Sequence, residues 1–493
     1  MHLAIVGQVV ALVTALIGVA MLAPLAVSAA LGERDLAALG LAAAVTIVPA
    51  AVAALVLRRR GTELGRREGL VAVFLSWVAA GLFGALPFWL YARLEGFPAL
   101  DSVTACVFET MSGLTTTGAT VVADVEALPH GLLLWRSMTQ WLGGMGIVVL
   151  FVAILPLFGL AAQALFRAEV PGTTKDKITP HLRDTARLLW LVYVGFSAAQ
   201  VLALALAGMG WFDAVCHAFT TMATGGYSTR NAGIPAFDSP AIEGVLIFFM
   251  LLAGLNFALH VQLVSTRGDL RGYWRDAEAR VYLLVLLGLT LAVGATIWAG
   301  GVVDGPLAAL RHGAFQVVSL MTTTGYHSTD FGGWLDAVPL APVLLLAAMF
   351  IGGCSGSTAG SMKVSRLIVL VKHGWRELAL AGHPRAVIPV RVGGRVVPEP
   401  IVSLTAAFFF LYVAHFLLGT LLVALTGEDL ITSIAAAAAT LGNVGPGFGA
   451  VGPTANYATL HPFAQWVLTY LMLVGRLELI TALVLLSRTF WRR

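Results

Sequence analysis

Four short glycine-centred segments interrupt the long apolar stretches of this chain, and they constrain its fold more than any other feature. They lie at residues 115–118, 223–226, 322–325 and 441–445. In a bilayer, backbone that is neither helix nor closed barrel persists only where protein buries it or water bathes it. Four such segments in one polypeptide therefore indicate a pore.

The composition indicates an integral membrane protein. Of the 493 residues, 58% are hydrophobic and only 11% are charged, and the mean hydropathy is +0.88, which excludes an ordinary soluble domain. The three cysteines form no CxxC pair, so neither a disulfide framework nor a zinc site is indicated. The apolar stretches hold no paired carboxylates, histidine cluster or nucleophile–base set, so we predict no enzyme. We also expect no nucleotide-binding motif, organic cofactor or nucleic-acid partner.

The order of apolar segments predicts a hairpin followed by four similar units. Segment 1–60 holds two helices, at 3–30 and 36–57, that form the amino-terminal hairpin. Each later unit has a long apolar helix, a short apolar helix, a glycine-centred loop and a second long helix. The long helices are expected at 69–92 and 131–158, 184–208 and 240–264, 279–300 and 340–372, and 400–425 and 463–488. The short helices are expected at 102–113, 212–222, 307–320 and 429–440, and they cannot span a membrane.

The loop glycines recur at similar intervals, roughly every 100 residues, which is typical of internal repetition. We therefore predict an all-α integral membrane protein whose four helix/re-entrant loop/helix repeats stand in a pseudo-fourfold arrangement around one pore. The repeats are expected at 69–165, 184–265, 279–375 and 400–490. The last helix of the third repeat is expected to be broken.

The basic residues predict the orientation in the membrane. Most of the 30 Lys and Arg residues fall in stretches that alternate as one face of the protein, which is cytoplasmic by the positive-inside rule. These stretches are 58–67, 167–187, 267–280, 363–395 and 488–493. Both termini are thus expected in the cytoplasm. Carboxylates such as Glu109 dominate the opposite face, where Arg136 is one of few cations; attraction of cations and ordinary topological bias both remain open as the reason.

The glycine-centred loops have the chemistry of a cation filter. A dehydrating cation needs oxygen ligands, and consecutive backbone carbonyls supply them without burying charge. The half-helix before each loop would point its partially negative carboxyl end toward the cation. Glycine permits the backbone conformations that aim carbonyls inward, and the threonines add hydroxyl groups.

The loop motifs resemble those of the Trk/Ktr/HKT superfamily of potassium transporters. They read TTTGAT at 115–120, ATGGYS at 223–228, TTTGYH at 322–327 and GNVGPG at 442–447. With the extra amino-terminal hairpin, the chain is most similar to the bacterial TrkH family, and the resemblance covers essentially the whole chain. It implies potassium uptake through a glycine-lined selectivity filter.

The resemblance also implies which residues form the potassium-binding filter. They are Thr116, Thr117, Gly118, Thr224, Gly225, Gly226, Thr323, Thr324, Gly325, Asn443, Val444 and Gly445. In that superfamily a serine in place of the first glycine accompanies sodium permeation, so Gly118 implies potassium. The fourth loop departs from the Thr-Gly signature, and the filter need not be symmetric.

A gate is expected in residues 352–361, where glycines and hydroxyl residues interrupt the last helix of the third repeat. Such a run cannot stay helical in lipid without loss, so we expect it to line a cavity beneath the filter. The resemblance implies that it obstructs the pore and moves; a kink of small residues at a helix contact is the alternative. The expected gate residues are Gly352, Gly353, Ser355, Gly356, Ser357, Gly360, Lys363 and Arg476.

Arg476 is an ionisable residue within the final apolar helix. Burial in a bilayer is costly for such a group, so it should face the interior of the helix bundle. We expect it to project toward the pore below the filter, to hydrogen-bond the 352–361 loop and to repel cations when the gate is shut. A structural arginine bonded to helix-end carbonyls is the alternative.

The resemblance further implies a homodimer in the bacterial inner membrane, seated on a cytosolic ring of regulatory subunits that bind NAD or ATP. The basic stretch 363–399 could dock such a partner or lie near anionic lipid. The sequence leaves a second mechanism open, in which a secondary transporter couples potassium to protons or another ion.

Overall fold

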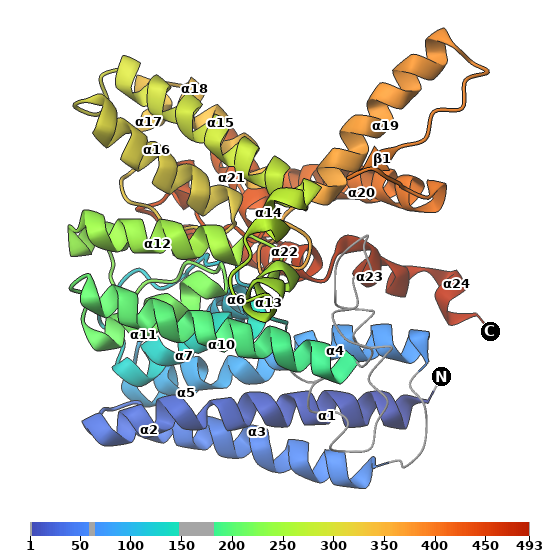
Figure 1. The fold of residues 1–493 in the computed structure, drawn as a ribbon. Helices are drawn as coiled ribbons and strands as arrows, with labels where there is room; N and C mark the ends of the chain where they lie inside the picture. The colour runs from blue at the N-terminus through green and yellow to red at the C-terminus, as the bar shows by residue number, and fades with distance from the viewer. Residues whose placement is uncertain (1, 59–64, 147–181, 493) are drawn as a thin grey trace.

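The computed structural model describes residues 2–58, 65–146 and 182–492, and in that part the chain is mostly helical (Figure 1). The end of the helix expected at 131–158 and much of the basic stretch 167–187 lie outside the described residues. The strands in the described part are β1 (Arg391–Val392) and β2 (Arg395–Val396), which pair antiparallel. These two strands of two residues each are a minor feature, and the expectation of a mostly helical protein is confirmed.

The amino-terminal hairpin consists of α1 (Leu3–Ala20), α2 (Leu22–Leu31) and α3 (Leu36–Val56). Gly32 adopts a left-handed conformation with φ 66° after α2, which lets the chain reverse toward α3. Helix α1 packs against both α3 and α4 (Arg66–Gly84). The hairpin therefore forms part of the same helical body as the segments that follow (Figure 1).

Four short helices precede the four glycine-centred loops, as predicted. They are α6 (Val103–Leu114), α11 (Trp211–Met222), α16 (Pro306–Met321) and α21 (Leu430–Leu441). Two begin at side-chain caps: Ser102 accepts a hydrogen bond from the Ala105 amide, and Asp429 accepts one from the Thr432 amide. Each helix ends two residues before the loop residue at which φ becomes positive.

Each short helix packs against the long helices before and after its loop. The helices ahead of the loops are α4 and α5 (Leu86–Glu95), α10 (Leu182–Leu206), α15 (Ala277–Ala299) and α20 (Glu399–Ala424), and those behind them begin with α7 (His130–Gly144), α12 (Pro240–Ala253), α18 (Leu340–Phe350) and α22 (Pro462–Arg476). The other α-helices are α13 (Phe257–Ser265), α14 (Arg271–Arg275), α17 (Trp334–Ala337), α19 (Val364–Gly382), α23 (Leu479–Leu483) and α24 (Arg488–Trp491). Single 3-10 turns occur at Pro98–Leu100, Ile234–Phe237, Gly449–Val451, Tyr457–Thr459 and Val484–Leu486.

Among the described residues, six helical segments are long and apolar enough to cross a membrane, or up to eight if each strongly bent helix pair is one span. Large apolar side chains such as Val52, Leu287 and Leu421 are exposed on these helices. Lipid, rather than water, is the solvent that suits such a surface. The protein is thus a multi-pass membrane protein.

More of the long helices that follow the loops are broken than the sequence indicated. The expected break is present: α18 ends at Phe350 and α19 begins at Val364. The helices expected to run unbroken through 240–264 and 463–488 were predicted wrongly, because α12 and α13 meet at 96° and α22 and α23 at 110°. Asn256 caps α13 by accepting from the Ala258 amide, and Glu478 has a φ of 56°, which no helix tolerates.

Helix α19 and the β1–β2 hairpin project away from the helical body, and both chain termini lie toward the same end of the molecule (Figure 1). The basic residues Lys372, Arg376, Arg391 and Arg395 lie on this projection. Lys372 donates a hydrogen bond to the carbonyl oxygen of Arg391 over 2.7 Å, which ties the hairpin to the helix.

Candidate functional site: four glycine-centred loops above a broken helix

The four glycine-centred loops have the same backbone conformation. Residues two positions before the loop glycine all have positive φ: 55° at Thr116, 54° at Thr224, 59° at Thr323 and 53° at Asn443. The loop glycines Gly118, Gly226, Gly325 and Gly445 have φ of 82°, 74°, 79° and 100°. Left-handed conformations are unusual for threonine. Their recurrence at one position in all four loops marks a shared architecture.

The loops contact one another in cyclic order. A methyl carbon added to Gly118 would lie 2.0 Å from the carbonyl oxygen of Gly225, and one added to Gly226 would lie 1.9 Å from that of Thr324. The series continues from Gly325 to Val444 at 2.0 Å and closes from Gly445 to Thr117 at 2.5 Å. Each neighbouring oxygen belongs to the residue just before a loop glycine. Four equivalent carbonyls therefore lie beside four glycines, and no larger residue fits there.

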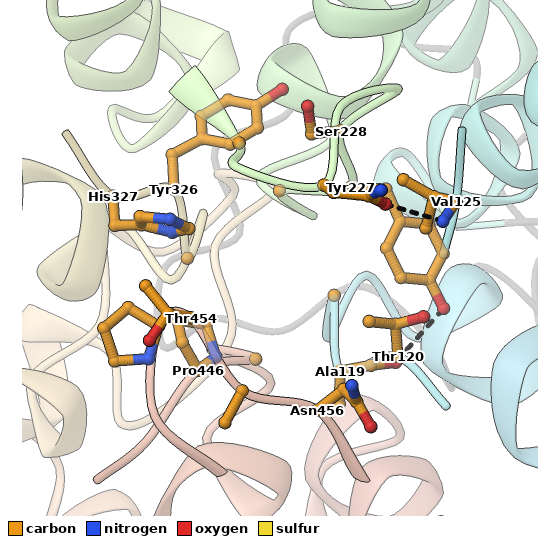
Figure 2. A pocket seen from close by; sticks show the side chains of 18 of the residues that line it. Ala119, Thr120, Val125, Tyr227, Ser228, Tyr326, His327, Pro446, Thr454 and Asn456 are labelled. Carbon is orange, nitrogen blue, oxygen red and sulfur yellow. Dashed lines mark hydrogen bonds between the residues drawn. The ribbon is translucent and has the colours of Figure 1, made fainter. Parts of the chain in front are cut away.

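A cavity of about 120 Å³ opens beside the loops, and all four contribute to its lining. Figure 2 looks into it and shows residues of four segments around one opening. They include Ala119 and Thr120, Tyr227 and Ser228, Tyr326 and His327, and Pro446 with Thr454 and Asn456. The sequence identified the loops but not the segment around Asn456, which completes the wall opposite the second loop.

Tyrosines that follow the loops tie neighbouring loops together. The Tyr227 hydroxyl donates to the carbonyl oxygens of Glu109 and Ala119, at 2.8 and 3.2 Å. The Tyr326 hydroxyl pairs with that of Thr220 on α11. The Tyr457 hydroxyl donates to the carbonyl oxygen of Gly445 in its own unit at 2.7 Å, and the Tyr457 amide donates to the Thr120 carbonyl oxygen after the first loop at 2.8 Å. These bonds hold rigid aromatic side chains against groups near the loops and so restrict how far the loops can separate.

The expected filter side chains are buried, and they differ in their partners. In the first loop, the hydroxyl oxygens of Thr115 and Thr117 are 2.8 Å apart. In the third loop, those of Thr322 and Thr324 are 2.9 Å apart. Asn443 donates through Nδ2 to Thr117 Oγ1 at 3.0 Å and to the Met472 carbonyl at 2.9 Å. Asn443, which replaces the threonine of the other loops, thus links the fourth loop to the first.

The 352–361 loop lies directly against the third and fourth glycine-centred loops. The Gly360 amide donates to Thr323 Oγ1 over 2.7 Å. A methyl carbon on Gly360 would lie 2.4 Å from the Gly442 carbonyl oxygen and 2.9 Å from Asn443 Cβ. Glycine at this position is therefore required for the close approach.

The other end of the 352–361 loop is anchored to the break between α12 and α13. The Cys354 amide donates to the Gly254 carbonyl at 2.8 Å, and the Phe257 amide donates to the Gly356 carbonyl at 3.0 Å. Glu278 of α15 accepts from the Ser355 and Ser365 amides at 2.7 and 2.9 Å. Two backbone amides bond to this half-buried carboxylate, which offsets the cost of taking it partly out of water. The sequence contained no signal for either anchor.

Arg476 lies at the carboxyl end of α22, not within a continuous helix as expected, because the chain bends directly after it. Its guanidinium donates to the Thr358 carbonyl of the 352–361 loop at 2.8 Å. It also donates to the carbonyls of Gly143 and Gly144 at the end of α7, at 2.7 and 2.8 Å. The side chain thus combines the two roles weighed as alternatives: it bonds the loop and it caps a helix end.

The 352–361 loop also lines a second cavity of about 120 Å³. Gly356, Ser357, Gly360 and Lys363 of the expected gate line it together with Arg476, whereas Gly352, Gly353 and Ser355 do not. Lys363 is buried and donates to the Ala359 carbonyl. Lys363, Arg366 and Arg476 thus bring three positive charges to this cavity, against the one carboxylate of Glu478.

One ion pair at this cavity escaped the sequence analysis. Arg366 lies in the first turn of α19. It pairs with Glu478 at the bend between α22 and α23, with 2.5 Å between Nη2 and Oε2. The Arg366 guanidinium also lies over the Phe408 ring, 4.0 Å from its centroid. The pair joins the helix that follows the 352–361 loop to the fourth unit of the chain.

The sequence of this chain is similar to those of known transport proteins. The family model of TrkH, described as a cation transport protein, matches residues 38–492. The chain is 44% identical over 437 residues to the Trk system potassium uptake protein TrkH of Salmonella typhimurium, with 88% of each protein covered. It is 42% identical over 494 residues to that of Halomonas elongata, with 100% of each covered.

Among solved structures, the crystal structure of the potassium transporter TrkH from Vibrio parahaemolyticus matches with a TM-score of 0.89 and 38% identity, and 100% of each chain is covered. These relatives are transport proteins and not enzymes. The resemblance drawn from the loop motifs is confirmed by both the family match and the similar structure. The chain belongs to the TrkH family of cation transport proteins.

Proposed function

We propose that this protein takes up potassium across the bacterial inner membrane through a single pore formed by the four glycine-centred loops. One observation carries the proposal: the loops contact one another in a closed cycle, and a backbone carbonyl lies beside the loop glycine at each of the four junctions. Related proteins are named for potassium uptake. The units 69–165, 184–265, 279–375 and 400–490 would then be pseudo-fourfold repeats around the pore, with 1–60 as an added hairpin.

In this proposal the filter is built from the residues named in the sequence analysis. The carbonyls of Thr117, Gly225, Thr324 and Val444 replace part of the water shell of potassium. Backbone oxygens suit this role because they attract a cation without adding a fixed charge that would trap it. The hydroxyls of Thr116 and Thr323 and the amide of Asn443 would extend the oxygen lining toward the second cavity.

The 352–361 loop and Arg476 form the gate in this proposal. The loop bonds to Thr323 through Gly360 and also lines the second cavity, which supports a place for it between the filter and that cavity. Lys363 and Arg476 place positive charge where a cation would leave the filter, so they repel it until the loop moves. The glycines at 352, 353, 356 and 360 supply the conformational freedom for that movement.

The orientation and partners follow from the same family. Both termini and the projecting α19 would face the cytoplasm, where their basic residues agree with the positive-inside rule. The relatives are components of the Trk system, which supports regulation by cytosolic subunits. We propose a homodimer seated on a cytosolic ring that binds NAD or ATP, with α19 and the β1–β2 hairpin as the docking surface.

The first prediction is that this chain restores growth at low potassium to a cell that lacks potassium uptake. Purified protein in vesicles should also conduct rubidium, an ion close to potassium in size. The reversal potential should follow the potassium gradient at any pH and sodium concentration, because a carbonyl filter needs no second ion. A reversal potential that moves with pH or sodium would instead support coupled transport, and absence of both rescue and flux would refute the proposed function.

The second prediction concerns the ion pair between Arg366 and Glu478. Glu478→Gln should raise basal rubidium flux by about fivefold, since a partly buried pair contributes roughly 1 kcal/mol to the state that it bridges. The measurement is flux into vesicles without regulatory subunits. Glu377→Gln is the matched control, because Glu377 also pairs with an arginine but is exposed on α19. Equal flux in Glu478→Gln and the control would exclude the pair from gating.

A further inference from the structure

A buried ion pair lies behind the first two glycine-centred loops. Arg136 of α7 and Glu109 of α6 are 2.8 Å apart between Nε and Oε1, and their side chains are 2% and 0% exposed. The sequence analysis placed both on the face opposite the basic stretches, and the structure adds that their side chains are buried between α6 and α7, where Arg136 also lines the first cavity. Neither has a role in the pore proposed above.

All three nitrogens of the Arg136 guanidinium are in use. Beside the bond from Nε to Glu109, Nη1 donates to the carbonyl oxygen of Ser228 at 3.2 Å, and Nη2 donates to Thr120 Oγ1 at 3.3 Å. The guanidinium lies over the Tyr227 ring, 4.0 Å from its centroid. Thr120 follows the first loop, whereas Tyr227 and Ser228 follow the second. One side chain thus bridges two neighbouring loops.

Glu109 completes the bridge. Its carboxylate accepts from Thr120 Oγ1 at 3.0 Å and from the Val121 amide at 2.9 Å. Its carbonyl oxygen accepts from the Tyr227 hydroxyl. The backbone just after Gly118 is therefore held by a carboxylate, and the tyrosine just after Gly226 is held by the same residue.

The position of Glu109 recurs in the other short helices, with weaker groups. His217 and Gln316 hold the same place relative to their loop glycines. His217 Nε2 lies 3.0 Å from Ser228 Oγ, and Gln316 donates through Nε2 to Ser328 Oγ at 3.3 Å. The fourth helix has Ala436 there, which has no polar group. In three of the four units, a polar side chain at this position thus hydrogen-bonds to the segment after the loop. Only in the first unit is that side chain a carboxylate.

Stability alone does not explain a buried ion pair here. Removing two charges from water costs several kcal/mol per ion, and well-packed apolar residues of similar size often stabilise a fold equally well. What the pair adds is directional hydrogen bonding to several partners at once. That property matters where small displacements of backbone oxygens change which ion fits.

We propose that Glu109 and Arg136 are positioning residues that fix the spacing of the first two glycine-centred loops and so determine discrimination between potassium and sodium. The inference rests on the proposed function of those loops as a filter. It assigns selectivity to a pair that contacts no ion. Loss of the pair relaxes discrimination while the pore still conducts.

The experiment compares rubidium and sodium fluxes in vesicles that contain Glu109→Gln, Arg136→Lys or the double variant Glu109→Gln/Arg136→Gln. We expect the rubidium-to-sodium flux ratio to fall about tenfold in each, the factor that corresponds to losing one charge-assisted hydrogen bond from the selective state. The double variant restores neutrality, so an effect of net charge would vanish in it and an effect of positioning would persist. Asp101→Asn is the matched control, because Asp101 pairs with Arg93 at 3.0 Å on an exposed surface.

Thr120→Val and Tyr227→Phe test the same bridge more gently, since each removes one hydroxyl group and no charge. They decide the question if a charge variant does not fold, as judged by size-exclusion profile. Folded variants that keep the wild-type flux ratio, or a double variant that regains it, would overturn the inference. A wild-type protein that passes neither rubidium nor potassium would refute the proposed function instead.

Discussion

Gly118→Ser is expected to reduce the rubidium-to-sodium flux ratio by at least about tenfold, the largest loss of selectivity that a single substitution should cause here. A Cβ at this position would lie 2.0 Å from the Gly225 carbonyl oxygen, so the backbone of one of the two loops must move. Gly118 also has a φ of 82°, and holding serine in that region costs about 1–3 kcal/mol. Both effects displace an oxygen that we assign to ion binding.

The measurement is paired rubidium and sodium flux in vesicles, together with growth at low potassium in high sodium. Gly195→Ser is the matched control, because Gly195 is exposed on α10 and an added Cβ would meet no atom within 4 Å. The control should retain the wild-type ratio. If Gly118→Ser folds and discriminates between the ions as the wild type does, the first loop is not part of the filter.

Arg476→Ala is expected to raise basal rubidium flux roughly thirtyfold. A unit positive charge about 8 Å from a cation repels it by about 2 kcal/mol at an effective dielectric constant near 20, and removing that repulsion lowers the barrier below the filter. The substitution also frees the Thr358 carbonyl, and with it one attachment of the 352–361 loop. Both changes favour an open pathway.

Flux of rubidium into vesicles without regulatory subunits measures this effect. Arg476→Lys keeps the charge but cannot reach the carbonyls of Thr358, Gly143 and Gly144 together, so it separates repulsion from loop anchoring. A lysine variant that stays shut would assign the gate to charge, and one that leaks would assign it to anchoring. Wild-type flux in both variants would remove Arg476 from the gate.

Much of the fold could be predicted because its signals are local in the sequence. Apolar stretches of suitable length predict helices in a membrane, and a glycine after a half-length apolar segment predicts a loop. The four short helices and the break after Phe350 were found in this way. The bends before Phe257 and after Arg476 were not, because Leu255, Asn256 and Glu478 are compatible with a continuous helix when considered alone.

For the candidate site too, features that are local in the sequence could be predicted, and contacts between distant residues could not. The loop glycines were identifiable, since few residues tolerate positive φ. Their neighbours were not: Gly118 lies beside Gly225, Arg476 bonds to Gly143 and Arg366 pairs with Glu478. Nothing in the sequence distinguishes Glu109 and Arg136 from ordinary surface charges, and only the packing of α6 against α7 buries them together.

Hydropathy and backbone freedom are properties of short segments. The amino-acid sequence was therefore enough to predict that the protein lies in a membrane, that it has four glycine-centred loops and which glycines those loops contain. The tertiary structure alone decided which carbonyl faces which glycine, which charges are buried and what holds the 352–361 loop. Those contacts join residues far apart in the chain, and their energies depend on distances of a few ångströms that no local pattern encodes.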